Sequence, residues 1–592
     1  MKRAIKKHWF ELSISLAVLA LCILGISILF GYMHRTNDDV LLRSIASGNY
    51  TGTPDAHLIY ILYPLGLVFK GLYSLWGGVS WYDLFVVSLH YFCWWAIVIR
   101  IAALFESKWV KLFSIGLTFA LLLILDLPYV VLNQYTALAG VCAATAVLWL
   151  ILFDGREKEG RFLHVALISA LMIVTLWLRK EVFFMAMPIG GCILLYQWLS
   201  HGKEEGFRST WLKWQGILLG IIAVVGLLSM LMDFVAYTSP QWQDFKAYNQ
   251  ARTDIFDYYN LAPYDLNEAA YEAEGIDTTD YEVINSMSLI LMPELDTAKM
   301  ERLAELAKWH KAQMEQYYSV YRKTMYSVCN VLFYNEVQPL GTALTVTAVA
   351  LLVMLVLYRR KAATVTALLA LLYEAVFVGY FIWKNRFPER VSFGLFAMLL
   401  LFFAGMFLRE YQEEKAERIW DRYPVGGRPK EELFWRVLPL GVLVFVLGNL
   451  GLYQYRNVSD QVKEYRQAIG QWQQVQYYAS QHPDKVYLVK ANMAGLKGDV
   501  MYLETVKEPD NTLLLGTWIS KSPHYHLRSE NLGLGIIGEE FPGSDRICLL
   551  QLETDNELWL TEYYEARGYE GKAVVCDLIE TAEGNIKVVQ MK

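Results

Sequence analysis

Two adjacent carboxylates, Asp38 and Asp39, form the first candidate for a chemical site. They follow an apolar run over residues 12–30 that is long enough to cross a bilayer, and Arg35 and Arg43 flank them. Ionised groups in or near hydrocarbon cost several kcal/mol unless water, a cation or a substrate meets them. We therefore predict a site at the mouth of the first membrane helix. The alternative is that the two residues only mark where this helix enters water.

Basic residues between apolar runs form a second candidate set. Several lie in short loops that we place on the outer side of a membrane, where lysine and arginine are usually scarce. A phosphate at the membrane surface would explain them, because guanidinium groups bind phosphate oxygens in a bidentate way. The alternative is that they pair with Asp38, Asp39, Glu181 and Glu389 or contact lipid headgroups. The residues concerned are Arg179, Lys180, Lys384, Arg386 and Arg390.

Weaker candidates surround these two sets. Asp55 and His57 lie in the first outer loop and Glu181 follows the basic pair, so each is a possible substrate or metal contact. Asp38 and Asp39 together could hold a divalent cation such as Mg²⁺ or Mn²⁺. The polar loops contain no P-loop signature, and we expect no bound nucleotide. The seven cysteines lack metal-ligand spacing, although Cys548 and Cys576 could pair in an oxidising compartment.

The composition predicts a polytopic α-helical membrane protein. Of the 592 residues 55% are hydrophobic and 19% are charged, and the basic residues form no stripe that would suggest nucleic acid. The basic N-terminus lacks a small-residue cleavage pattern, so we expect the first helix to be an uncleaved anchor. We predict eleven transmembrane helices near residues 11–32, 82–104, 112–131, 136–153, 162–178, 183–200, 214–236, 338–357, 363–383, 391–408 and 434–453.

One apolar stretch, residues 56–78, is not predicted to span. Only about a dozen apolar residues precede Lys70, and we expect an interfacial or re-entrant helix. With this choice the basic loops, such as DGREKEGR at 154–161 and YRRK at 358–361, all fall on the cytoplasmic side with the N-terminus. The protein is then expected in the plasma membrane with its C-terminus outside the cytoplasm.

Two larger segments should lie on the outer side. Within a transmembrane domain of residues 1–453, the first outer loop covers 33–81 and a large helical loop covers 238–337, where 298–326 shows helical periodicity. Residues 454–592 begin with a polar helix over 462–479. Short apolar runs at 486–489, 501–505, 513–518, 547–552, 573–578 and 586–589 follow, which predicts an extracytoplasmic soluble α/β domain.

The loop NDDVLLRSIASGNYTGTPDAH after the first helix resembles the GT-C superfamily of polytopic glycosyltransferases, which carry an acidic residue or pair at this place. The span count, the interfacial helix and the C-terminal domain are similar to their architecture. The resemblance implies transfer of a sugar from a polyprenyl-phosphate-linked donor to a cell-envelope glycan, lipid or protein on the outer face. It implies Asp38 as the general base, with Asp39 orienting it, binding a sugar hydroxyl or holding a cation. Arg386 and Arg390 would bind the donor phosphate, with Arg179 and Lys180 as second candidates.

Three other functions stay open from the sequence. The first is an O-antigen-ligase or polymerase-like transferase, which a histidine base would favour. The second is a secondary transporter or flippase of an envelope precursor. That function would need buried polar groups in the spans, for which His90, Arg100 and Glu374 are the candidates. The third is a non-enzymatic envelope protein, for which eleven spans are far more than an anchor requires.

Overall fold

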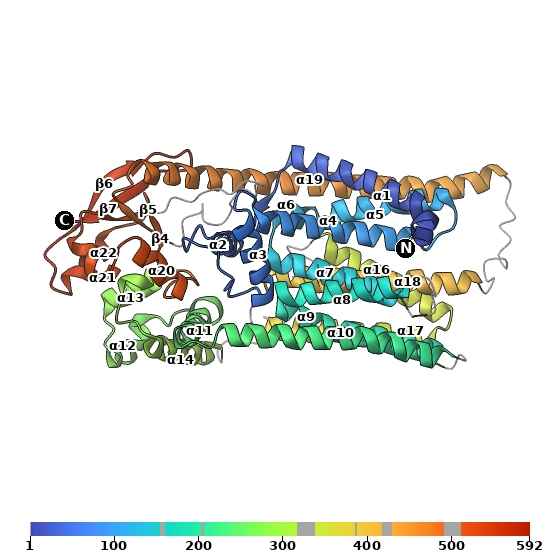
Figure 1. Ribbon diagram of the computed structural model, residues 1–592, viewed down its shortest axis with the longest axis horizontal. Coiled ribbons are helices and arrows are strands. Elements are labelled where there is room, and N and C mark those ends of the chain that lie inside the picture. Colours follow the sequence, from blue (N-terminus) through green and yellow to red (C-terminus); the bar gives the residue numbers. More distant parts are fainter. Residues whose placement is uncertain are drawn as a thin grey trace.

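A bundle of long apolar helices forms one half of the molecule, and a cap of shorter helices and a sheet covers one end of it (Figure 1). The computed structural model describes residues 2–153, 155, 160–202, 206–315, 338–384, 387–416, 429–490 and 511–592. Within these ranges nine helices are long and apolar enough to cross a membrane. They are α1 (Lys2–Leu29), α4 (Trp81–Ala102), α5 (Lys108–Leu125), α8 (Arg161–Leu178), α9 (Lys180–His201), α10 (Phe207–Ala236), α16 (Leu340–Leu357), α17 (Lys361–Trp383) and α18 (Glu389–Ala416).

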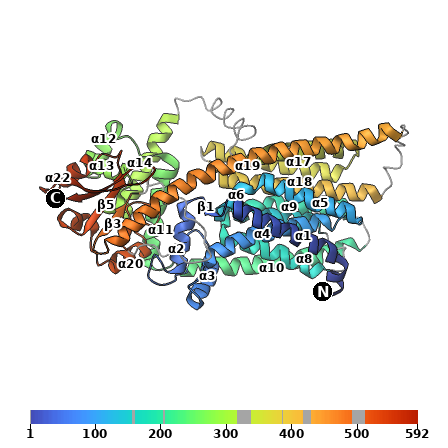
Figure 2. The same cartoon turned by 90° about the horizontal axis from the view of Figure 1, so that it is seen from above.

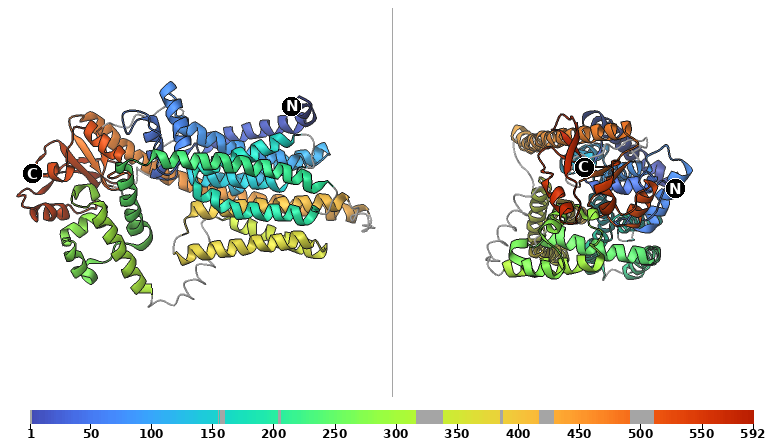
Figure 3. Two further views of the ribbon diagram at one scale, coloured as in Figure 1. Left: turned by 60° about the horizontal axis from the view of Figure 1, so that its bottom comes forward. Right: turned by 90° about the vertical axis from the view of Figure 1, so that its left-hand side faces the viewer.

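These nine helices match nine of the expected spans, and the other two fall on α7 (Tyr135–Ile151) and the first part of α19 (Pro429–Gln481). Helix α7 is almost completely buried and packs closely on α18. A Cβ atom built on Gly140 would lie 2.6 Å from the Cα atom of Gly394, so the glycines are what allow the two backbones to approach. Helices α16 and α17 lie along one side of the bundle (Figure 3).

The first outer loop lies at the end of the bundle that the cap covers, which we call the capped end (Figure 1). Strand β1 (Met33–His34) pairs in parallel with β2 (Leu132–Asn133), which follows the short helix α6 (Leu127–Val131). Helix α2 (Asn37–Ser47) comes next. Helix α3 (Tyr63–Leu75) has 13 residues, or about 20 Å, and is too short to cross the roughly 30 Å hydrocarbon core, as expected for residues 56–78.

Residues 238–315 form the helical part of the cap. The elements are α11 (Pro240–Thr253), the π-helix η1 (Asp254–Tyr259), α12 (Tyr264–Ala273), α13 (Thr278–Asn285), the 3₁₀ turn η2 (Leu289–Leu291) and α14 (Thr297–Glu315). Met300, Leu303 and Ala307 of α14 are buried, in agreement with the periodicity of the sequence. The end of that predicted helix, beyond Glu315, lies outside the described residues.

The C-terminal part of the cap is a five-stranded sheet with short helices, which confirms the predicted α/β domain. The strand order is β4-β3-β5-β7-β6, with β3 parallel to β4 and β5 and with β7 antiparallel to β5 and β6. The strands are β3 (Val486–Val489), β4 (Thr512–Leu514), β5 (Ile547–Leu552), β6 (Ala573–Ile579) and β7 (Ile586–Met591), and the helices are α20 (Pro523–Asn531), α21 (Ile537–Glu540), the 3₁₀ turn η5 (Phe541–Gly543) and α22 (Leu558–Glu565).

Some details of the C-terminal segment differ from the expectation. The strand expected over 513–518 ends at Leu514, and the one expected over 501–505 lies outside the described residues. Cys548 and Cys576 are free thiols, and both contact the side chain of Gln590. The domain boundary expected after residue 453 falls inside the continuous helix α19, which runs from the bundle into the cap (Figure 2).

The two outer segments are one body, although the sequence suggests two. Buried side chains of residues 248–307 share a hydrophobic cluster with buried side chains of the sheet, including Leu488 and Leu549. The hydroxyl group of Tyr563 donates a hydrogen bond of 2.8 Å to the carbonyl oxygen of Leu291. Gly516 lies so close to the backbone of Met287 that no larger residue would fit. The cap is therefore held over the bundle as a unit.

Candidate functional site

Asp39 is a buried anchor for the first turn of α2. Its Oδ1 atom accepts hydrogen bonds from the hydroxyl group of Tyr82 at 2.9 Å and from the backbone N–H of Tyr135 at 3.0 Å. Its Oδ2 atom accepts one from Thr36 at 3.1 Å. Burial raises the pKa of Asp39 to about 6, against the effects of His34 and Tyr82. This carboxylate therefore joins α2 to the starts of α4 and α7.

Asp38 is the half-buried member of the pair. Burial raises its pKa, and the positive charges of Arg390 and Arg179 are the strongest effects that oppose the rise, followed by the nearby side chain of Trp518. Arg390 is the second residue of α18, Arg179 lies between α8 and α9, and Trp518 belongs to the C-terminal part of the cap. Asp38 is thus the carboxylate around which distant parts of the chain meet.

Arg179 is held beside Asp38 by aromatic rings and a carboxylate. Its Nη1 atom donates to the hydroxyl group of Tyr135 at 3.2 Å, and its Nε atom lies 2.9 Å from Glu181 Oε2. The guanidinium carbon lies 5.6 Å from the ring centroid of Tyr60, which stacks on Tyr135 with 6.5 Å between centroids. The extended backbone at Arg179, with φ −156°, separates α8 from α9 and places this side chain at the capped end.

Arg390 is placed by its neighbour Glu389. The carboxylate of Glu389 accepts hydrogen bonds from Arg35 at 2.5 Å and from the hydroxyl group of Tyr129 at 2.7 Å. These contacts fix the first turn of α18 next to the first outer loop. Among the described residues, the side chains of Arg390 and Lys384 have no hydrogen-bond or ion-pair partner. Arg386 lies outside the described residues.

A cavity of about 670 Å³ joins these cations to an apolar channel. Arg179, Lys384 and Arg390 line it at the capped end, together with Glu181. Since Tyr373 lies eleven residues before Lys384 along α17, the cavity reaches about 16 Å into the bundle. The deeper wall is apolar and aromatic, and it comes from α9 and α17: Phe184, Met185, Pro188, Tyr373, Phe377 and Phe381. Such a shape fits an amphiphile with an anionic head.

Lys180 and the pair Asp55 and His57 lie elsewhere. Lys180 is exposed, does not line the cavity, and acts electrostatically on Lys246. The imidazole of His57 contacts Asp55 Oδ1 at 2.8 Å, and His524 of α20 contacts the same oxygen at 3.2 Å. Burial would raise the pKa of Asp55, but hydrogen bonds from His524 and His57 outweigh burial and lower it. This cluster docks the cap on the first outer loop.

A divalent cation shared by the two aspartates would have to compete with the hydrogen bonds of Asp39. Both oxygens of Asp39 already accept hydrogen bonds, whereas the strongest charges that act on Asp38 are those of Arg390 and Arg179. In the part of the chain that the structure describes, no group of three or more histidine, cysteine, aspartate or glutamate side chains is arranged to hold a metal ion. The arrangement around Asp38 is better suited to bind an anion beside a carboxylate.

Sequence reasoning missed the contributions of the cap. Trp518 and Arg252 of the cap both lower the pKa of Asp38. Asn249 of the cap lowers the pKa of Tyr60, which lies in the first outer loop. Arg252 Nε donates to Asn249 Oδ1 at 2.9 Å, so these two side chains of α11 are joined to each other. These residues lie up to 480 positions from Asp38 in an aromatic-rich and polar sequence. The one usable signal was the presence of large outer segments.

Comparison with solved structures finds ArnT from Cupriavidus metallidurans, in one crystal structure bound to undecaprenyl phosphate and in another in the apo state. The identities are 12% and 11%, respectively, and both alignments have a TM-score of 0.38 and cover 98% of this chain and 97% of the ArnT chain. No protein-family model matches the chain, and no curated protein does. At this TM-score the likeness carries no argument about function.

Proposed function

We propose that the chain is a membrane glycosyltransferase of the GT-C type that transfers a sugar from a polyprenyl-phosphate-linked donor to a cell-envelope glycan, lipid or protein. One observation carries the proposal. A cavity is lined by Arg390 and Lys384, which have no hydrogen-bond or ion-pair partner among the described residues, and by an apolar, aromatic wall; Asp38 lies near Arg390 and Arg179. A phosphate head, a polyprenyl tail and a base for the acceptor hydroxyl match these three features.

Asp38 would act as the general base. Its carboxylate takes the proton from the acceptor hydroxyl while that oxygen forms a bond to the anomeric carbon of the sugar. The bond from this carbon to the donor phosphate breaks, and the phosphate leaves with the electron pair. Arg390, Lys384 and Arg179 stabilise the charge that develops on the phosphate oxygens. Asp39 does not react, and it holds the turn of α2 that carries Asp38.

The charge distribution supports an extracytoplasmic position for the capped end. Helices α5, α8, α10 and α17 begin at the opposite end of the bundle with basic residues in or next to their first turn. Basic residues near span ends favour the cytoplasmic side. We therefore place the N-terminus in the cytoplasm and the cap outside, in the plasma membrane, where envelope acceptors are found.

Two of the three polar side chains that would favour a transporter, His90 and Arg100, form hydrogen bonds to other parts of the protein. His90 contacts Asp126 at 2.8 Å, and Trp94 donates to the same carboxylate at 2.5 Å. Arg100 donates to the backbone carbonyl of Leu152 at the end of α7. Only Glu374 of these three candidates has no hydrogen-bond or ion-pair partner in the described part of the chain. These contacts join α4 to the ends of α5 and α7.

The test is native mass spectrometry of the protein extracted with its own lipids. The parent chain should retain a polyprenyl-phosphate sugar, and Arg390→Ala combined with Lys384→Ala should lose it. Each charge-assisted contact is worth about 1.5–3 kcal/mol, so the double variant should bind the donor at least about 100-fold more weakly. Lys180→Ala is the matched control and should retain the donor. Equal retention by the double variant, or ordinary phospholipids alone in the parent, would refute the proposal.

A further inference from the structure

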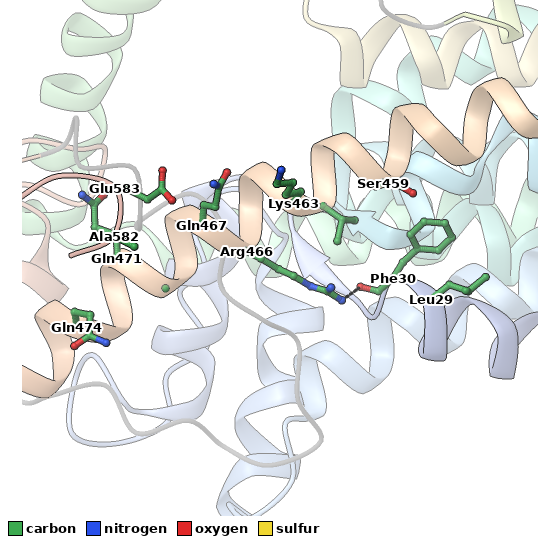
Figure 4. A pocket seen from close by; sticks show the side chains of 12 residues that line it. Leu29, Phe30, Ser459, Lys463, Arg466, Gln467, Gln471, Gln474, Ala582 and Glu583 are labelled. Atoms are coloured by element: carbon green, nitrogen blue, oxygen red, sulfur yellow. Dashed lines mark hydrogen bonds between the residues drawn. The ribbon is translucent and has the colours of Figure 1, made fainter.

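A second cavity lies where the end of α1 meets α19 and the turn between β6 and β7 (Figure 4). It has a volume of about 520 Å³. Leu29 and Phe30 of the α1 end, Lys463 and Arg466 of α19, and Glu583 of the turn between β6 and β7 line it. Three separate parts of the chain therefore contribute to this groove, which we call the α1–α19 groove. It shares no lining residue with the cavity beside Asp38.

The surface on the bundle side of the groove is apolar. Leu24, Ile28 and Leu29 of α1 are 57%, 72% and 56% exposed, and Phe445 and Leu452 of α19 are 71% and 61% exposed. Large apolar side chains in such numbers on two long helices must face lipid tails. Tyr453 and Tyr455 follow on α19 and are also exposed, which is typical of the membrane interface. The lining of the groove on α19 begins at Ser459, about one turn beyond Tyr455.

The charged side of the groove offers donors for an anion. The side chain of Lys463 is exposed and has no hydrogen-bond or ion-pair partner among the described residues. Arg466 Nη2 donates to the backbone carbonyl of Phe30 at 2.9 Å, which holds the guanidinium group at the end of α1 (Figure 4). The side chains of Gln467 and Gln474 on the same helix are exposed and add amide groups. Positive charge thus stands directly beyond an apolar, lipid-facing surface.

We propose that the α1–α19 groove binds the phosphate headgroup of an anionic phospholipid from the surrounding leaflet. Lys463 and Arg466 contact the phosphate, the amide of Gln467 contacts headgroup hydroxyls, and the acyl chains lie along Leu29 and the apolar faces of α1 and α19. The order of apolar, aromatic and basic residues along α19 follows the order of tails, interface and headgroups in a bilayer. This match in order and charge is the reason for choosing a membrane lipid as the occupant.

The bound headgroup would connect the bundle to the cap. Helix α19 enters the cap, which carries Trp518, and the turn at Glu583 belongs to the same sheet domain. A lipid between α1, α19 and this turn adds contacts between bundle and cap at a place remote from Asp38. The proposal depends on the membrane setting and is independent of the proposed transferase activity.

The test uses the full chain in phosphatidylcholine nanodiscs with and without phosphatidylglycerol. Native mass spectrometry should show one retained phosphatidylglycerol in the parent, and the lipid should raise the Tm. Lys463→Glu should lower that retention about tenfold or more and remove the Tm rise, because it replaces an attraction by a repulsion. Lys463→Arg should restore both. The control is Lys572→Glu, a charge reversal at an exposed residue of the cap directly before β6. This variant should behave as the parent.

Two further readouts identify the ligand and the site. Inorganic phosphate should not displace the lipid, and displacement at equal phosphate concentration would show a free-anion site and overturn the proposal. Retention of the polyprenyl-phosphate donor should be unchanged in Lys463→Glu, since this residue is not near the first cavity. Equal phosphatidylglycerol retention in Lys463→Glu and the parent would refute lipid binding in the groove, whatever the outcome for the donor.

Discussion

Two neighbouring residues of α2 should give opposite results when they are changed. Asp38→Asn should remove transfer activity without loss of stability, whereas Asp39→Ala should lose stability. The structure predicts this contrast because the charges of Arg390 and Arg179 act on the half-buried Asp38. Asp39, in contrast, is buried and accepts three hydrogen bonds. The sequence, with two adjacent aspartates, offers no reason to expect a difference.

The size of each effect follows from the contacts. A general base contributes about 10²- to 10⁴-fold to a rate, which corresponds to about 2.7–5.4 kcal/mol in the activation free energy. Asparagine has the shape of aspartate, so Asp38→Asn should unfold within about 2 °C of the parent. Asp39→Ala leaves the buried N–H of Tyr135 and the hydroxyl group of Tyr82 without their acceptor. Each unsatisfied group costs about 1–3 kcal/mol, so the loss is about 2–6 kcal/mol.

The activity assay follows the discharge of the co-purified donor. Purified protein with its retained polyprenyl-phosphate sugar is mixed with an envelope extract, and the loss of the donor mass is measured over time. Thermal unfolding of the same samples gives Tm. Discharge by Asp38→Asn at the parent rate would exclude Asp38 as the base. An Asp39→Ala variant as stable as the parent would show that the hydrogen bonds of Asp39 do not anchor α2.

Three further predictions concern stability. The pKa of Asp39 rises from 3.8 to about 6 on folding, so the folded state binds the proton more tightly, and stability should fall by about 3 kcal/mol as the pH rises from about 4 to about 6. This fall should be absent in Asp39→Asn, and parallel Tm curves for parent and variant would contradict the assignment. His524→Ala removes a donor to Asp55 and should speed amide hydrogen exchange in α20, whereas His526→Ala should not; equal exchange in both would argue against docking through this cluster. Gly140→Leu should cost about 1–3 kcal/mol or more, because the new Cβ atom meets Gly394, while Gly116→Ala on α5, with open space around it, should change Tm little.

The division of the bundle into spans could be predicted from the sequence because it depends on local composition. Nine expected spans coincide with apolar helices, and the break after Leu29 and the short α3 follow from the length of apolar runs. Strands β3, β5, β6 and β7 were predicted close to their observed ends for the same reason, since each is an apolar run between turn residues. The span over α19 was expected to end near 453, but its polar second half continues the helix into the cap.

The sequence by itself determined that carboxylates and arginines would lie at the ends of the apolar helices, because charged groups are excluded from hydrocarbon. Only the tertiary structure decided which of them meet. Asp39 became an anchor because the starts of α4 and α7 bring Tyr82 and Tyr135 to it, and Asp38 was left beside Arg390. Trp518 joins them from the far end of the chain. Such meetings depend on the packing of distant segments, and a hydrophobic pattern records only which face is buried.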